Sequence, residues 1–308
     1  MDYFLTDTQK EIKNLARKIA EEKVKPVRAE LDEKGEFPHE LMKEFARAGF
    51  LGVYIPEEYE GGGGGVFEMC LIVEEISRIC GGVGVCYAAN GLSAYPIILA
   101  ANEEQKKRIL PKMASGEWIG AFGITEPNAG SDASGIETTA VKDGNHYVLN
   151  GTKHFITNGE VAHLNTIIAS TDKTKGGRGL SAFIVEKGTP GFKFGRHENK
   201  LGIRASITTE LIFEDCRVPV ENRIGAEGAG FVIAMRTFDR TRPGVGAQAL
   251  GIAQGALEAA TEHALNRIQF GAPISALEGI QFMLADMTTK VEAARALVYA
   301  AARHVDSG

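Results

Sequence analysis

Hydrophobic and polar positions divide the chain into two helical regions that flank a region of short strands. Apolar residues recur at helical spacing from residue 6 to about 120, and a capping-box pair, Thr6 and Gln9, precedes the first run. Between about 121 and 225, short apolar runs bounded by Gly, Pro, Asn and Asp replace this period. Helical spacing returns after Gly228 and ends in a last helix at about 280–305. The pattern predicts the order helical, β, helical.

We therefore expect an α+β multidomain chain. It has an N-terminal helical domain at 1–120, a central antiparallel β domain at 121–225, and at 226–308 two long helices of a C-terminal bundle. The dipeptide Asn150-Gly151 predicts a tight hairpin turn between a strand ending at Leu149 and the next strand. The five glycines at 61–65 are either a flexible linker or a place where the backbone approaches another element closely.

Composition narrows the classes of function. The 308 residues are 44% hydrophobic and 24% charged, as in globular proteins that bury one or more cores. A net charge of -6 without a Lys- or Arg-rich run argues against nucleic acid as a partner. The four cysteines lack metal-binding spacing, so we expect reduced, mostly buried thiols and no metal. Without a targeting sequence or an apolar run of about 18 residues, a bacterial cytoplasmic protein without membrane insertion is expected.

Two polar loops each follow a short apolar strand. In the first, Ile124-Thr-Glu-Pro-Asn-Ala-Gly-Ser-Asp132, Thr125 and Ser131 offer hydroxyl and N–H groups to an acceptor-rich edge or a pyrophosphate. In the second, Phe155-Ile-Thr-Asn-Gly159, the phenyl ring offers a face to an aromatic ring system and the threonine a donor to a ring nitrogen. Either loop alone is typical of an ordinary strand-end turn. The two together indicate a flavin site.

With these two loops the chain resembles the acyl-CoA dehydrogenase family, and the resemblance extends from the first helix to the last residue. Six further segments match that family in order: Tyr59–Gly65, Glu103–Arg108, Leu201–Arg204, Phe213–Pro219, Phe238–Pro243 and Arg267–Gly271. The resemblance implies the family fold, which has an N-terminal helical domain, a central β domain and a C-terminal four-helix bundle. This order agrees with the hydrophobic pattern.

The resemblance also implies an activity. An FAD-dependent enzyme of this family removes the α-proton of an acyl-CoA thioester while the β-hydrogen leaves as hydride to flavin N5, and its electrons pass to an electron-transferring flavoprotein. The family works in fatty acid metabolism as a homodimer or homotetramer. Alternatives are an enoyl-CoA reductase that runs the reaction in reverse and a non-dehydrogenase flavoprotein relative, such as an oxidase or monooxygenase. A flavin-free scaffold is a third alternative.

Site residues carried over by resemblance fall into three groups. Those expected to contact the flavin and its pyrophosphate are Phe122, Ile124, Thr125, Gly130, Ser131, Phe155, Ile156 and Thr157, with Thr157 reaching flavin N5. Those expected to hold the pyrophosphate and adenosine from a neighbouring subunit are Arg267, Gln269, Phe270 and Glu278. Those expected on the CoA side are Ser131, Asp239 and Arg242, although the i,i+3 spacing of the last two is also typical of a surface ion pair.

Three positions depart from the family pattern. Phe155 stands where many members have Trp, Gln269 where Thr is common, and Glu278 where a Gln is usual. In the segment that by resemblance closes the acyl pocket, Ala88 and Ala89 have small side chains, which predict room for a longer or cyclic acyl group.

The catalytic base stays unassigned. In the family a glutamate on a later bundle helix takes the proton, and the matching position lies beyond Gly308. An alternative base position used by some branches corresponds to Thr241, which cannot act as a base at neutral pH. We therefore expect this chain to be part of a longer enzyme. The rival hypothesis is a naturally shortened protein without ordinary activity.

Overall fold

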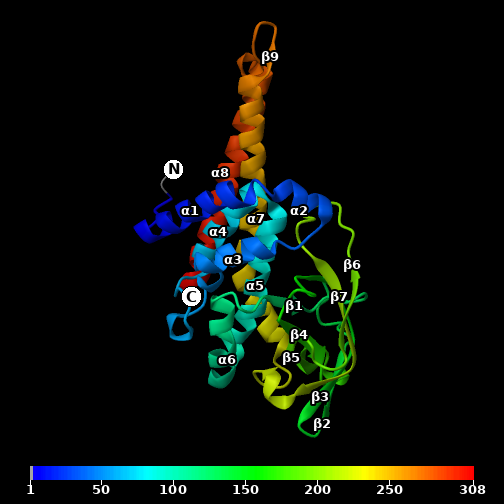
Figure 1. Ribbon diagram of the computed structural model, residues 1–308. Helices are drawn as coiled ribbons and strands as arrows, with labels where there is room; N and C mark the ends of the chain where they lie inside the picture. The colour runs from blue at the N-terminus through cyan, green and yellow to red at the C-terminus, as the bar shows by residue number, and fades with distance from the viewer. Residues whose placement is uncertain (1–2) are drawn as a thin grey trace.

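The computed structural model describes residues 3–308, and its elements follow the predicted order of helices, strands and helices (Figure 1). The N-terminal helices are α1 (Asp7–Ile19), α2 (Arg28–Lys34), α3 (His39–Arg47), α4 (Val66–Ile79), α5 (Gly81–Ala100) and α6 (Glu103–Ala114). The strands of the β region are β1 (Gly120–Gly123), β2 (Thr139–Asp143), β3 (His146–Thr157), β4 (Leu164–Ser170), β5 (Leu180–Glu186), β6 (Phe192–His197), β7 (Thr208–Pro219) and β8 (Arg223–Ile224). The last part comprises α7 (Gly230–Asn266), the short strands β9 (Ile268–Gln269) and β10 (Ala272–Pro273), and α8 (Glu278–Ser307). The predicted fold class is confirmed.

The first helix begins at the capping box that the sequence predicts. Thr6 Oγ1 accepts a hydrogen bond from the Gln9 N–H at 3.2 Å, and Gln9 Oε1 accepts one from the Thr6 N–H at 3.0 Å. These two bonds satisfy backbone donors that have no partner within the helix.

The five glycines at 61–65 form a close approach of backbone segments, which answers the question left open by the sequence. A Cβ atom on Gly61 would lie 2.0 Å from the Ile55 carbonyl oxygen, and one on Gly65 would lie 2.5 Å from the Asp306 carboxylate. The N–H groups of Gly62 and Gly64 each donate at 2.8 Å to carbonyl oxygens of the preceding turn. There is no room for side chains at these positions. The glycines therefore form a close-packed turn and not a flexible linker.

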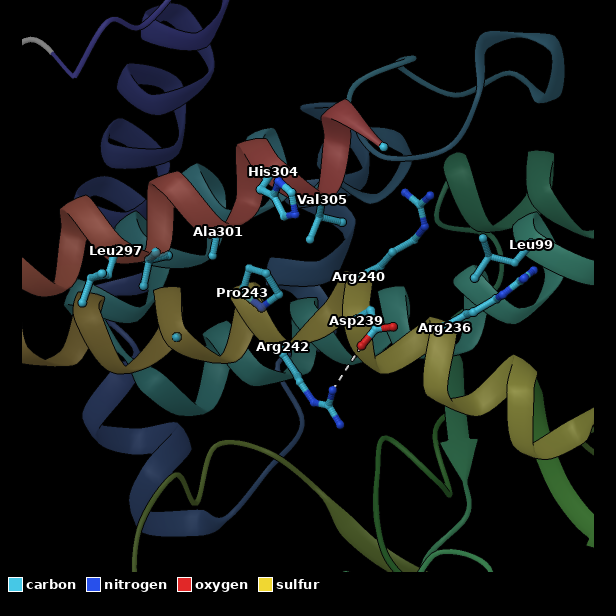
Figure 2. A pocket seen from close by; sticks show the side chains of 13 residues that line it. Leu99, Arg236, Asp239, Arg240, Arg242, Pro243, Leu297, Ala301, His304 and Val305 are labelled. Carbon is cyan, nitrogen blue, oxygen red and sulfur yellow. Dashed lines mark hydrogen bonds and ion pairs between the residues drawn. The ribbon is translucent and has the colours of Figure 1, made fainter. Parts of the chain in front are cut away.

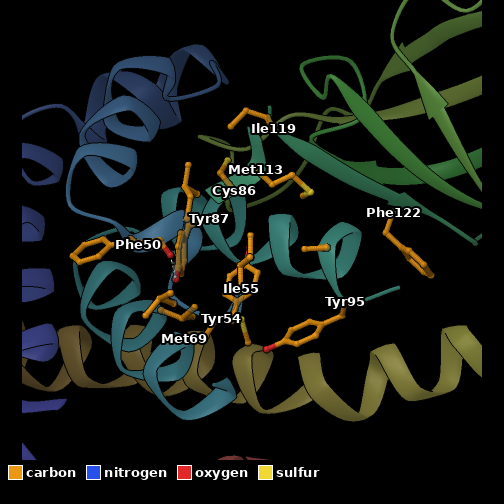
Figure 3. Close-up of a cluster of buried hydrophobic side chains, with 14 of the residues drawn as sticks. Phe50, Tyr54, Ile55, Met69, Cys86, Tyr87, Tyr95, Met113, Ile119 and Phe122 are labelled. Carbon is orange, nitrogen blue, oxygen red and sulfur yellow. Dashed lines mark hydrogen bonds between the residues drawn. The ribbon is translucent and has the colours of Figure 1, made fainter. Parts of the chain in front are cut away.

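The main core lies among α3, α4, α5 and α6 (Figure 3). Tyr54 and Tyr95 stack with their ring centroids 5.5 Å apart, and the Tyr87 hydroxyl donates to the Phe50 carbonyl at 3.0 Å. Helix α5 is long and apolar enough to cross a membrane by length and composition, but 67% of its apolar window is buried inside the protein. Its apolar surface is therefore that of a core helix, packed against α4, α7 and β1.

One curved sheet forms the β region, in the order β6-β7-β3-β2-β4-β5-β8, with β1 paired to β4. The pairings are antiparallel except for β1 with β4 and a single parallel bridge between β2 and β4. The buried side chains of these strands form a second hydrophobic core. In this core Tyr147 packs edge-on against Phe183, with the ring centroids 4.9 Å apart.

The prediction of a hairpin turn at Asn150-Gly151 is wrong. Strand β3 runs straight through these residues, and the turn between β2 and β3 lies earlier, at Gly144, whose φ of +58° suits it. At Asn150 the pairing with β7 instead shifts register, and the Asn150 side chain accepts from the Asp215 N–H at 2.8 Å. Asn-Gly here makes a β-bulge, because its side-chain bonds replace a missing rung of the ladder.

The helices α7 and α8 form a long arm that leads away from the β region and ends at the β9–β10 hairpin, at the top of Figure 1. Leu250, Leu257 and Val291 pack between the two helices. The arm therefore separates its tip from the two polar loops of the β region.

Candidate functional site

The two polar loops predicted from the sequence lie side by side. The loop at 124–132 follows β1, and the segment at 155–159 ends β3. The His154 N–H donates to the Thr125 carbonyl oxygen at 2.8 Å, which joins one loop directly to the other. The parallel pairing of β1 with β4 and the long β3 ladder therefore bring together segments that are about thirty residues apart in the sequence.

A second bulge in β3 directs Phe155 outwards. The pairing of β3 with β7 shifts between Lys153 and Ile156, and Phe155 has a φ of +59°. Consequently Lys153 and Ile156 are both buried, whereas Phe155 is 61% exposed. A left-handed backbone is uncommon for a bulky residue and is often found at binding sites, where it sets the direction of a side chain.

The first loop presents polar groups on the same side. A turn closed by the Glu126 N–H, which donates to the Ala129 carbonyl at 2.9 Å, carries the chain round to Gly130 and Ser131, both exposed. Thr125 and Thr157 are half-buried. Nothing lies within 4 Å of a Cβ built on Gly130, so space remains above this part of the loop.

These features fit the isoalloxazine end of a flavin. An exposed aromatic face, two half-buried threonines and an open, polar loop supply the flat apolar surface and the donors that such a ring system requires. Ile124 and Ile156 are buried beneath the loops and give them an apolar base. Among residues 3–308, no cluster of three His, Cys, Asp or Glu side chains is arranged to hold a metal ion.

A buried ion pair joins the loops from below, and the sequence reasoning missed it. Lys153 Nζ lies 2.6 Å from Glu126 Oε1, and the exposed fractions of the two side chains are 0% and 3%. Both residues were visible in the sequence, Glu126 inside the first motif and Lys153 two positions before the second. A charged residue at each of these positions, beside apolar strands, was the available signal.

Helix α7 forms the neighbouring wall. Phe122 of β1 meets Phe238 of α7 edge-on, with centroids 5.9 Å apart, and the Arg242 guanidinium lies 5.6 Å from the Phe238 ring centre. Asp239 accepts from Arg242 at 3.2 Å, and both side chains are about two-thirds exposed. The surface ion pair is therefore present, and it lies beside a residue that contacts β1.

Asp239 and Arg242 also line an open cavity of about 900 Å³ between α7 and α8 (Figure 2). Thr241, on the same helix, is buried. Its hydroxyl donates to the Thr237 carbonyl oxygen at 3.0 Å. Ala89 is buried on α5 and Ala88 is half-buried.

The remaining cofactor residues lie elsewhere in the chain. Four exposed residues lie in or next to the β9–β10 hairpin, which Figure 1 shows at the tip of the arm, far from the β region: Arg267, Gln269, Phe270 and Glu278. The side chain of Phe270 is 94% exposed and its φ is +52°. A single chain therefore holds two separate groups of candidate residues, as expected if the tip serves a neighbouring subunit.

Comparison with known proteins places the whole chain in one family. The sequence profiles for the N-terminal, middle and C-terminal domains of acyl-CoA dehydrogenase match residues 6–117, 121–216 and 228–308. The acyl-CoA dehydrogenase, short-chain specific, of Clostridium acetobutylicum is 50% identical over 303 residues, which cover 98% of this chain and 80% of that protein. Acryloyl-CoA reductase (NADH) of Anaerotignum propionicum is 48% identical over 310 residues, 100% of this chain and 79% of that protein.

A solved structure agrees with these sequence matches. It is described as "Electron transferring flavoprotein of Acidaminococcus fermentans: Towards a mechanism of flavin-based electron bifurcation", and one of its chains superposes on this one with a TM-score of 0.96 at 51% identity. The superposition covers 98% of this chain and 80% of that chain. On these matches and on its fold, the chain belongs to the acyl-CoA dehydrogenase family.

Proposed function

We propose that this protein is an FAD-dependent acyl-CoA dehydrogenase that introduces a double bond between the α- and β-carbons of an acyl-CoA thioester. The observation that carries the proposal is the junction of the two loops, where the His154 N–H binds the Thr125 carbonyl and Phe155 faces outwards beside them. The family membership of the chain supports the same conclusion.

The chain's own residues bind and orient in this reaction. Phe155 offers its ring to the flavin face, Thr125 and Thr157 donate hydrogen bonds, and the open turn at Gly130 and Ser131 receives the pyrophosphate side. When bound, FAD supplies the acceptor for the hydride that leaves the β-carbon. Asp239 and Arg242, beside Phe238, form the wall for the CoA portion. The base that takes the α-proton is left unassigned.

Assembly completes the cofactor site in this proposal. The tip residues Arg267, Gln269, Phe270 and Glu278 reach the pyrophosphate and adenosine of a neighbouring subunit in a homodimer or homotetramer. A guanidinium such as that of Arg267 suits a pyrophosphate because it presents paired N–H donors. Glu278 opposes the same phosphates, so its carboxylate weakens the grip that Arg267 provides.

Electrons pass from the reduced protein to an electron-transferring flavoprotein, and the protein works in the bacterial cytoplasm. The fold similarity to a chain from the Acidaminococcus fermentans flavoprotein structure supports the proposed electron transfer.

We also propose that the three domains meet near residues 120 and 225, close to where α6 and β8 end.

An enoyl-CoA reductase is the second candidate, favoured by the 48% identity to the acryloyl-CoA reductase of Anaerotignum propionicum. The same site serves both directions, because binding that stabilises the transition state accelerates the forward and reverse reactions alike. Direction is decided by the electron donor or acceptor that the protein meets.

An anaerobic absorbance titration with acyl-CoAs tests the main proposal. We expect the purified protein to be yellow and its visible flavin band to bleach with saturated acyl-CoAs. A band that stays unchanged with every acyl-CoA, but is bleached by a reducing donor and recovers with enoyl-CoA, favours the reductase. A colourless protein that takes up no added FAD contradicts both.

The same titration addresses the acyl group. Similarity to a short-chain-specific dehydrogenase favours short chains, whereas the small side chains of Ala88 and Ala89 favour a longer or cyclic group. A panel of short, long and cyclic acyl-CoAs separates these alternatives. A strict preference for the four-carbon substrate ends the argument from Ala88 and Ala89.

A further inference from the structure

The carboxylate of Glu126 closes the first loop from inside. Its Oε2 accepts from the Glu137 N–H at 2.6 Å, and its Oε1 accepts from the Thr138 N–H at 3.0 Å. These donors lie directly before β2, eleven and twelve residues further along the chain. One side chain therefore ties the beginning of the loop to its end and fixes the path of the exposed residues between them.

Lys153 connects this closed loop to the bulge that carries Phe155. Its ammonium group donates to Glu126 Oε1 at 2.6 Å and to the Ile124 carbonyl oxygen at 3.2 Å. The His154 N–H, which follows directly, donates to the Thr125 carbonyl. Three bonds from two consecutive residues of β3 thus reach the three consecutive residues that follow β1.

Stability alone is a poor reason for such a pair. Both charges are removed from water, and burial lowers the pKa of Lys153 to about 8 although Glu126 acts in the opposite direction. Lys153 in turn holds the pKa of the Glu126 carboxyl below its usual value, so the pair favours the carboxylate, while burial outweighs it for the ammonium. Apolar residues of similar size often replace a buried ion pair without loss of stability, so its presence calls for another explanation.

We propose that Glu126 and Lys153 are positioning residues for the flavin, which hold the loop of Thr125 and Ser131 at a fixed distance from the bulge of Phe155 and Thr157. This inference rests on the proposed function, because the flavin is the ligand that needs both segments at once. The pair touches no reacting atom. It acts through the backbone of the two loops that hold the cofactor.

The variants E126Q, K153M and E126Q/K153M of the full chain test the proposal. The double variant removes both charges and keeps one acceptor for the loop N–H groups. We expect its melting temperature without FAD to equal or exceed that of the wild type, and its FAD dissociation constant to rise by about tenfold or more. The exposed pair between Asp143, at the end of β2, and Arg217 of β7 supplies the control D143N, which leaves both quantities unchanged.

The two readouts separate a positioning role from a structural one. A double variant that melts much earlier than the wild type, and binds FAD in proportion to its folded fraction, assigns the pair to stability and overturns the proposal. A double variant that binds FAD as tightly as the wild type overturns it as well. Equal flavin absorption maxima in bound wild type and variant would also count against it, since altered loops change the surroundings of the ring.

Amide hydrogen exchange keeps this test independent of the proposed function. In the protein without FAD, we expect E126Q and E126Q/K153M to exchange faster at 125–138 and 153–157, with the rest of the sheet unchanged. Unaltered exchange in these segments contradicts the positioning role even if the wild type binds no FAD. A wild type that binds no FAD but shows the faster local exchange on substitution contradicts only the proposed function.

Discussion

Phe155 combines an exposed aromatic ring with a backbone conformation that costs free energy. At a φ of +59°, any residue with a Cβ atom loses about 1 kcal/mol relative to glycine. We expect F155A and F155G to bind FAD with similarly reduced affinity, because both lose the ring. F155G should melt at a higher temperature than F155A, because only glycine relieves the left-handed backbone.

Fluorescence titration of FAD and thermal unfolding measure these two effects separately. If F155A binds FAD like the wild type, the ring does not contact the cofactor. If F155A melts as late as F155G, the left-handed conformation is not under strain at this bulge.

The buried ammonium of Lys153 predicts a dependence of stability on pH. The pKa of Lys153 is about 8 in the folded protein and near its ordinary value of 10.5 when the chain is unfolded. Between these values the unfolded chain holds a proton that the folded chain has released, so the free energy of unfolding gains a contribution that rises with pH. The wild type should therefore gain stability relative to E126Q/K153M from about pH 8 to 10. A difference that stays level or falls over this range contradicts a lowered pKa.

At the scale of elements, α8 caps α4. The Val66 N–H donates to Asp306 Oδ1 and the Phe67 N–H donates to Asp306 Oδ2, each at 2.8 Å. Both are first-turn donors of α4, which have no partner within the helix. We expect D306A to lower the free energy of unfolding by about 1 kcal/mol, and D306N by less, since one acceptor remains.

Urea unfolding checks this prediction, with D286A as the matched control on the same helix. Asp286 makes an exposed i,i+4 pair with Lys290, so its removal should cost about 0.3 kcal/mol. Equal losses for D306A and D286A contradict the capping role.

Helices α4 and α8 also share a buried carboxylate. Glu74, 2% exposed, accepts from Arg295 Nε at 3.0 Å and from the Tyr299 hydroxyl at 2.6 Å. Burial together with this carboxylate raises the pKa of Tyr299, so its hydroxyl stays a donor. Lys13 Nζ also lies 3.1 Å from Glu74 Oε1. We expect R295M to lower the free energy of unfolding by about 2 kcal/mol, because Glu74 then keeps only Lys13 as a counter-charge.

The double variant E74Q/R295M gives the control for that prediction. In this variant Lys13 keeps Glu75, 3.5 Å away, as its partner, so stability should return most of the way to that of the wild type. If the double variant loses as much as the sum of the single ones, the two side chains act independently and the argument from counter-charge is wrong.

At the scale of the whole molecule, the tip of the arm is an apolar surface that no other part of residues 3–308 covers. Phe270 is 94% exposed, Phe282 65% and Met283 63%. Surfaces of this kind mark sites of association. We expect F270D to shift the protein from a dimer or tetramer towards smaller species in size-exclusion chromatography with light scattering, and to weaken FAD retention.

The control for the arm is K290A, which changes an exposed polar position of α8 away from the tip. It should leave both mass and FAD content unchanged. An F270D protein with the wild-type mass shows that the tip is not an assembly surface, and one with normal FAD content removes the tip from the proposed cofactor site.

Local patterns allowed the order of helices and strands, the capping box at Thr6 and the pair of polar loops to be predicted, because each depends on neighbours within a few residues. The same locality explains the error at Asn150-Gly151. This dipeptide favours a turn by itself, but pairing with Asp215 makes it a bulge, and no short window of sequence contains both partners.

Contacts between distant segments account for the rest. The bond between His154 and Thr125, the pair of Glu126 with Lys153 and the cap that Asp306 places on α4 join residues 27 to 240 positions apart. Chain folding brings such groups together and removes water from them, which sets their hydrogen bonds and the lowered pKa of Lys153. The sequence by itself determined which residue types are candidates for the site. Only the packing of the chain decided the distances between these residues, their burial and their separation into a loop site and an arm tip.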